Sequence, residues 1–187
     1  MESLKERYNK IVVPEMMKKF GYKNRMAVPS FRKVVLNSSF GKEAVTKTGS
    51  EREKLQNLIM QDLSLIAGQK VNLVKSKKSI AGFKLREGLN IAAVVTLRKQ
   101  RMWDFLERYI YLSLPRTRDF KGIEPKSIDK NGNLSMGFKE HISFPEIFTE
   151  KEKTIFGLEI TFVTNAKNKE EGLELFKLLG FPMREVK

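Results

Sequence analysis

Residues 90–98 read Asn-Ile-Ala-Ala-Val-Val-Thr-Leu-Arg, and this stretch decides the fold. Its apolar positions recur at every second residue, at Ile91, Ala93, Val95 and Leu97. The positions between them end on the hydroxyl of Thr96 and the cation of Arg98. Side chains that alternate in this way point to opposite sides of a β-strand, so we expect a strand with one core face and one free face.

A second predicted strand, residues 28–40, divides in the same way. Its core side is formed by Val34, Leu36 and Phe40, and its other side by Lys33, Val35 and Asn37. A cation and an amide on the second side are typical of a surface that is solvated or holds a ligand.

Further strands are expected over residues 70–74, 133–139 and 157–164. Helices are expected over residues 2–20, 50–67, 100–113 and 168–179. In the second helix Ser50 and Glu53 match a capping box. Strands and helices follow one another in mixed order, which predicts an α+β fold. We expect a two-layer sandwich, in which about four helices pack on one face of a mostly antiparallel sheet of about five strands. We find no repeat or Ser/Gly linker, so residues 1–187 are expected to form a single domain.

The charge of the chain points to its partner. The 187 residues include 36 Lys and Arg against 22 Asp and Glu, a formal net charge of +14. Residues 70–101 carry nine basic side chains and one acidic one, more than half of the excess. Such concentration favours a contact surface for nucleic acid, with an acidic membrane surface as the competing interpretation.

Within this region, residues 75–88 read Lys-Ser-Lys-Lys-Ser-Ile-Ala-Gly-Phe-Lys-Leu-Arg-Glu-Gly. Two glycines interrupt regular structure, which predicts a mobile basic loop between two strands. A loop of this kind can reach phosphates without reading bases. A solvated hairpin tip is the alternative.

The chemistry of an enzyme is missing from the sequence. Cysteine is absent, and the single histidine, His141, is expected on the surface or in a loop. Gly41-Lys42 lacks the hydroxyl residue and the first glycine of a phosphate-binding loop. We therefore expect no catalytic residues, no metal and no cofactor. No apolar run approaches the ~18 residues of a membrane span, and the charged N-terminus does not resemble a secretory signal, which favours the cytoplasm.

Seven strings occur in the order of a known family. They are Val28-Pro29 with Lys33-Val-Val-Leu-Asn37, Ile66-Ala-Gly-Gln-Lys70, Lys77-Lys-Ser-Ile-Ala-Gly-Phe-Lys-Leu-Arg86, Val95-Thr-Leu-Arg98, Leu114-Pro-Arg-Thr-Arg-Asp-Phe-Lys-Gly122, Gly132-Asn133 and Phe144-Pro-Glu-Ile147. Through them the chain resembles the large-subunit ribosomal protein five family, bacterial proteins that bind 5S rRNA in the central protuberance. The sequence departs from the family at Ser38-Ser39, where glycines are usual.

The resemblance implies three contact regions. A polar patch for 5S rRNA matches Asn37, Gln69 and Thr96, and with neighbouring cations the expected contacts are Lys33, Asn37, Gln69, Lys70, Thr96 and Arg98. The basic loop matches one that reaches toward peptidyl-site tRNA, through Lys75, Lys77, Lys78, Ser79, Gly82, Phe83, Lys84 and Arg86. An intersubunit bridge to small-subunit ribosomal protein thirteen would involve Arg116, Arg118, Asp119, Lys121, Phe144, Pro145 and Glu146.

The expected partners are thus 5S rRNA, 23S rRNA, peptidyl-site tRNA, small-subunit protein thirteen and neighbouring proteins of the central protuberance, without a membrane. The ribosome would be cytoplasmic or organellar. Two other functions remain open, namely an RNA-binding or chaperone module that works off the ribosome, and a basic enzyme acting on nucleic acid. The enzyme would need a metal–carboxylate cluster or histidines, which the sequence lacks.

Overall fold

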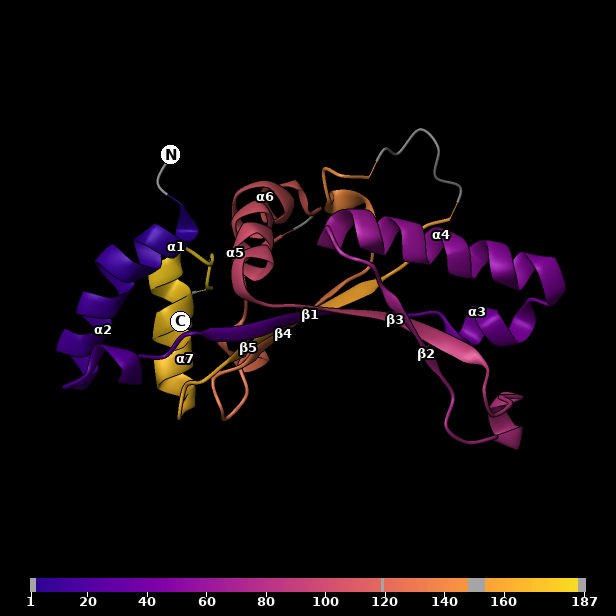
Figure 1. Ribbon diagram of the computed structural model, residues 1–187, viewed down its shortest axis with the longest axis horizontal. Helices are drawn as coiled ribbons and strands as arrows, with labels where there is room; N and C mark the ends of the chain where they lie inside the picture. Colours follow the sequence, from indigo (N-terminus) through magenta and orange to yellow (C-terminus); the bar gives the residue numbers. More distant parts are fainter. Residues whose placement is uncertain (1–2, 119, 148–153, 185–187) are drawn as a thin grey trace. The chain divides into compact units, whose positions relative to one another are not determined.

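A computed structural model describes residues 3–118, 120–147 and 154–184. Within these ranges five strands form one open antiparallel sheet, in the order β2-β3-β1-β5-β4 (Figure 1). The strands are β1 (Phe31–Ser39), β2 (Asn72–Lys75), β3 (Asn90–Leu97), β4 (Leu134–Phe138) and β5 (Leu158–Thr164). The expected α+β fold is confirmed.

The helices are α1 (Leu4–Arg7), α2 (Val13–Phe20), α3 (Gly41–Thr46), α4 (Gly49–Ala67), α5 (Lys99–Arg108), α6 (Leu114–Arg116) and α7 (Lys169–Leu179). Two π-helical turns, Tyr8–Val12 and Tyr109–Ser113, join α1 to α2 and α5 to α6. Each turn precedes a proline, Pro14 or Pro115, that lies in the first turn of the next helix. A proline has no N–H to donate and is tolerated there, so the helix expected to end before Pro115 continues to Arg116.

Both central strands divide their side chains as predicted. In β1, Val34 and Leu36 are buried, and Val35 and Asn37 are half-buried. In β3 the buried positions are Ala93, Val95 and Leu97. Ser38 also lies on the buried side of β1, and its hydroxyl donates to the carbonyl oxygen of Gly157 at 2.9 Å. That hydrogen bond explains how a polar side chain fits where the family usually has glycine.

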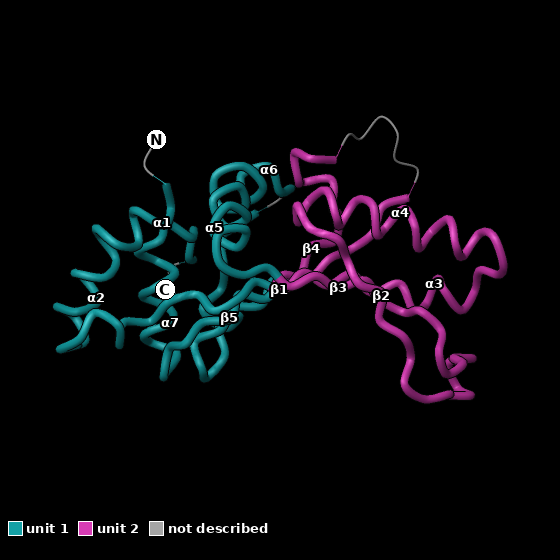
Figure 2. Tube along the Cα trace, in the orientation of Figure 1, with its two compact units in different colours: residues 1–34, 97–136, 161–187 teal, residues 35–96, 137–160 magenta. Residues whose placement is uncertain are grey.

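The chain contains two compact units (Figure 2). Unit 1 comprises residues 1–34, 97–136 and 161–187, and its core is aromatic. Tyr109 lies 5.1 Å from Phe162 between ring centroids, and Phe176 lies 5.0 Å from Phe181. Burial raises the pKa of Tyr109 well above its usual value, which keeps this phenol neutral in the core.

Unit 2 comprises residues 35–96 and 137–160 and has an aliphatic core. The long helix α4 buries Leu55, Ile59, Leu63 and Ile66. The strands of this unit bury Leu36, Ala93 and Val95. In Figure 1 α4 runs over β1 and β3, and the loop that joins β2 to β3 projects away from α4. In this view α4 and the loop thus lie on opposite sides of β3.

The capping box predicted at Ser50 and Glu53 is wrong. The helix α4 begins at Gly49, its N-cap is Thr48, and no side chain caps it. Instead the Arg52 guanidinium donates from Nη2 and Nε to the carbonyl oxygen of Lys47, at 2.8 and 3.1 Å. The sequence pattern thus placed the N-cap two residues too late, at Ser50 instead of Thr48.

Two backbone segments of unit 1 touch at a pair of glycines. A Cβ atom built on Gly172 would lie 2.5 Å from the Cα of Gly132, which has a φ of +73°. We expect Gly172→Ala to lower the free energy of unfolding by about 3 kcal/mol, since backbone cannot move aside as a side chain can. The control is Gly137→Ala, where nothing lies within 4 Å. Chemical denaturation of both variants measures the difference, and equal stabilities would contradict the close approach.

Candidate RNA interface

The structure brings together two of the polar residues expected at the 5S rRNA site. Gln69 follows Gly68, whose left-handed conformation ends α4. Its side-chain Nε2 donates to the carbonyl oxygen of Thr96 in β3 at 3.3 Å. Asn37 lies in β1, which is the neighbour of β3 in the sheet. Gln69 and Thr96 thus meet, and Asn37 lies on the strand next to that of Thr96, all within unit 2.

The face that carries Thr96 is largely uncharged. Cross-strand pairing sets Asn72 opposite Val94 and Val74 opposite Ala92, so these side chains share a face of the sheet. Ala92, Val94 and Thr96 are half-buried, and Val74 is exposed. Small apolar side chains beside amides and a hydroxyl make a flat surface suited to sugar edges and bases.

Asn37 has an unpaired atom in this surface. Its side-chain oxygen is buried and accepts no hydrogen bond among the described residues. A buried acceptor without a partner is unfavourable. If the Asn37 side chain rotated toward an RNA hydroxyl, its amide oxygen could accept a hydrogen bond and its amide nitrogen could donate one.

The cations expected around this patch belong to both units. Lys70 is exposed and follows Gln69 in unit 2. Lys33 is half-buried and Arg98 is exposed, and both belong to unit 1.

The loop of residues 75–88 is tied together by its own hydrogen bonds. At its base the amide of Ser76 donates to the carbonyl of Leu89 at 2.7 Å, and the amide of Gly88 donates to the carbonyl of Ser76 at 3.0 Å. Halfway along, the amide of Glu87 donates to the hydroxyl of Ser79 at 2.9 Å. These bonds give the loop a defined path, while its motion relative to the sheet stays a prediction.

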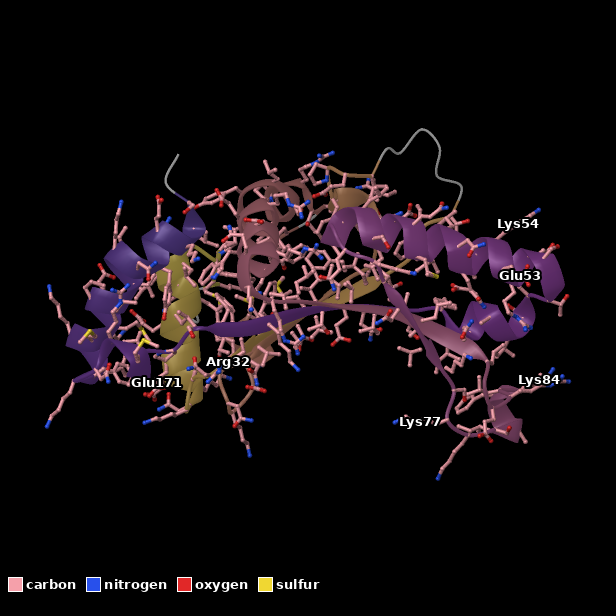
Figure 3. The ribbon with its side chains drawn as sticks, in the orientation of Figure 1. Arg32, Glu53, Lys54, Lys77, Lys84 and Glu171 are labelled. Carbon is pink, nitrogen blue, oxygen red and sulfur yellow. The ribbon has the colours of Figure 1, made fainter. Side chains whose placement is uncertain are left out.

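The cations of this loop extend into solvent. Figure 3 shows Lys77 and Lys84 on opposite sides of the loop. The other exposed cations of the loop are Lys75, Lys78 and Arg86. None of the five forms an ion pair with another described residue, so their field is available to phosphates.

The residues expected at the intersubunit bridge fall into two groups. Arg116, Arg118 and Lys121 are exposed in unit 1, and Asp119 lies outside the described residues. The second group, in unit 2, comprises Phe144, Pro145 and Glu146. Phe144 is buried and packs edge-on against Phe138 at 6.1 Å, so it supports the segment from inside. Pro145 and Glu146 are half-buried, so each keeps some surface for a partner.

His141 is buried, so of the two expectations the surface is wrong, whereas its place in a short 3-10 turn between β4 and β5 agrees with a loop. Its ring stacks on Phe156 with 3.8 Å between centroids, and its Nε2 lies 3.8 Å from Oδ2 of Asp62 in α4. The amide of Phe156 donates to its Nδ1 at 3.4 Å. These contacts fasten the segment before Phe144 to α4. The sequence pattern does not reveal them because Asp62 lies far from His141 along the chain.

Neither a metal-binding cluster nor a membrane-spanning helix is found in the described part of the chain. It contains no cluster of three imidazole or carboxylate side chains that could hold a metal ion. None of its helices has the length and apolar character needed to cross a membrane.

Comparison with known proteins identifies the family. The family model for Ribosomal protein L5 matches residues 24–86, and a second model, for the C-terminus of the same ribosomal family, matches residues 90–183. The large ribosomal subunit protein uL5 of Geotalea daltonii is 50% identical over 184 residues, which cover 98% of this chain and 99% of the relative.

Relatives from other sources match equally fully. The uL5 protein of Halothermothrix orenii is 45% identical over 99% of this chain and all of its own length. Large ribosomal subunit protein uL5c of Tetradesmus obliquus is 48% identical over 98% of each chain. The chain therefore belongs to the ribosomal protein L5 family, a structural constituent of the large ribosomal subunit and not an enzyme.

Proposed function

We propose that this protein binds 5S rRNA through the outward face of the sheet in unit 2, centred on Asn37, Gln69 and Thr96. The observation that carries the proposal is the hydrogen bond from Gln69 to the Thr96 carbonyl, which fixes the end of α4 beside β3. The unpaired Asn37 oxygen and the half-buried apolar side chains of Ala92 and Val94 next to Thr96 add support. Lys33, Lys70 and Arg98 would supply phosphate contacts.

The same protein would make two further contacts. The basic loop of residues 75–88 reaches toward peptidyl-site tRNA. The segments around Arg116 and Pro145 approach small-subunit ribosomal protein thirteen. Additional contacts with 23S rRNA and neighbouring proteins would complete the central protuberance.

Binding to 5S rRNA is expected to weaken steeply as salt is raised. Each phosphate that a cation neutralises releases counterions, so log K falls against log salt with a slope of about −0.7 to −0.9 per contact, borrowing values for single- and double-stranded DNA. Titration of 5S rRNA at several salt concentrations measures the slope. An unrelated RNA of equal length is the control, and it should bind more weakly at every salt concentration. Salt-independent affinity, or equal affinity for both RNAs, would contradict the proposal.

A module that works off the ribosome is the competing function, and sedimentation separates the two. A ribosomal component travels with large subunits through a sucrose gradient and is retained after a moderate salt wash. Recovery of the protein only at the top of the gradient would favour the free module.

A further inference from the structure

The tip of the basic loop, residues 80–85, carries an aromatic side chain. Phe83 is 73% exposed and Ile80 is 45% exposed, between neighbours that are mostly cationic or small. A single exposed apolar side chain is ordinary on a protein surface, so exposure alone carries no argument. What distinguishes Phe83 is the backbone that presents it.

That backbone is a closed turn. The amides of Ile80 and Leu85 each donate to the other residue's carbonyl, at 2.9 and 3.1 Å. Inside this bridge the amide of Phe83 donates to the carbonyl of Ile80 at 3.3 Å, and that of Lys84 to the carbonyl of Ala81 at 2.9 Å. The turn therefore fixes the backbone of Phe83 before any partner arrives, which lowers the entropic cost of a contact.

The turn also contains strain that glycine would avoid. Lys84 has a φ of 51°, in the left-handed region that costs a residue with a side chain about 1–2 kcal/mol. Gly82, by contrast, has no such φ, and a Cβ atom there would meet nothing within 4 Å. The fold of the tip thus accepts a side chain at residue 82 and would prefer none at residue 84. The chain has the opposite arrangement, with glycine at residue 82 and a cation at residue 84, the two neighbours of Phe83 in the sequence.

We infer that Phe83 is a stacking platform for an unpaired base, so that the loop recognises a looped segment of RNA and not only its phosphates. Bases inside a duplex are already stacked on both sides, whereas an unpaired base offers a free face to an aromatic ring. Exposed cations beside the ring, such as Lys84, would hold the adjoining phosphates. This inference rests on the proposed contact between the loop and tRNA.

The test uses ribosomes assembled with full-length variants and follows dissociation of tRNA from the peptidyl site. Stacking contributes about 1–3 kcal/mol per base, so Phe83→Ala and Phe83→Leu should each speed dissociation at least about fivefold. Neither change removes a charge, so the salt dependence should stay that of the parent protein. Phe83→Trp keeps an aromatic ring and should keep the parent rate. The matched control is Met26→Ala, which shortens a side chain that is 84% exposed in unit 1.

The outcomes separate this inference from the proposal beneath it. If tRNA dissociates from ribosomes with Phe83→Leu at the parent rate, an apolar side chain is sufficient for the contact, and the inference that a base stacks on Phe83 is wrong. If loss of the loop cations weakens retention while every Phe83 variant behaves as the parent, the tRNA contact stands and the platform is wrong. If neither set of variants has an effect, the loop does not contact tRNA and both fail.

A second measurement addresses the unpaired base directly. The full-length protein is titrated with an RNA hairpin and with a blunt duplex of equal charge. Phe83→Ala should lower affinity for the hairpin and leave the duplex unchanged. Equal losses on both RNAs would overturn recognition of an unpaired base.

Discussion

Leu36→Ala is expected to lower the free energy of unfolding by about 2–5 kcal/mol. The Leu36 side chain is fully buried on the core side of β1, and its removal leaves a cavity in the core. The strand β1 runs through both compact units, and we propose that they unfold together as one domain. Denaturation followed by circular dichroism and by intrinsic fluorescence should therefore show one shifted transition. Two separate transitions would contradict a single domain.

The adjacent variant Asn37→Ala is the matched control for this loss. Asn37 lies on the opposite side of the strand, and truncation removes an oxygen that is already unpaired, so stability should hardly change. Affinity for 5S rRNA should fall by about 0.5–1.5 kcal/mol for Asn37→Ala and for Thr96→Ala, the net value of one hydrogen bond. Unfolding of Asn37→Ala at the denaturant concentration that unfolds Leu36→Ala would show that the two faces were assigned wrongly.

Removal of four loop cations should have a large effect on tRNA. Lys77, Lys78, Lys84 and Arg86 are exposed, and their replacement with alanine deletes no core side chain. Thermal stability should stay nearly unchanged, and 5S rRNA affinity should fall only modestly through the general field. In assembled ribosomes tRNA should dissociate faster from the peptidyl site, with a shallower salt dependence, because phosphate contacts are lost.

A matched variant distinguishes the effect of losing the loop cations from the effect of a lower net charge. Four exposed cations of unit 1 lie outside every expected contact region, namely Lys18, Lys23, Lys130 and Lys169. Their replacement removes the same charge and should leave tRNA retention at the parent level. If the loop variant loses 5S rRNA binding and retains tRNA normally, the loop belongs to the 5S rRNA contact instead.

Local patterns predicted the elements well where side-chain spacing alone decides them. The two-residue alternation in β1 and β3 gave the correct face to each side chain, because a strand that is buried on one side admits no other register. The last helix was correctly expected to begin at about residue 168: Asn168 is the N-cap of α7, and its side chain accepts from the amide of Glu171 at 2.8 Å. That cap needs only residues adjacent in the sequence, so the sequence contains all of its geometry.

Predictions failed where distant residues meet. His141 looked like a surface histidine because its stacking partner Phe156 and its polar partner Asp62 are remote in the sequence. The cap of α4 was misplaced because the helix begins at Gly49 and has Thr48 as its N-cap, without the side-chain hydrogen bond that the pattern at Ser50 and Glu53 predicted. The helix predicted to end before Pro115 continues to Arg116, because a π-helical turn leads into a new helix that has Pro115 in its first turn.

The sequence by itself determined the class of this protein. Period-two strands and period-three-to-four helices predict an α+β sheet fold, a concentrated positive charge predicts a nucleic-acid partner, and ordered motifs predict the ribosomal family. Only the tertiary structure decided that Gln69 lies against Thr96, that Gly132 and Gly172 touch, and that Phe83 is presented by a closed turn. The physical reason is separation along the sequence. Periodicity and charge are properties of neighbours along the chain, whereas these contacts depend on how separate elements pack together.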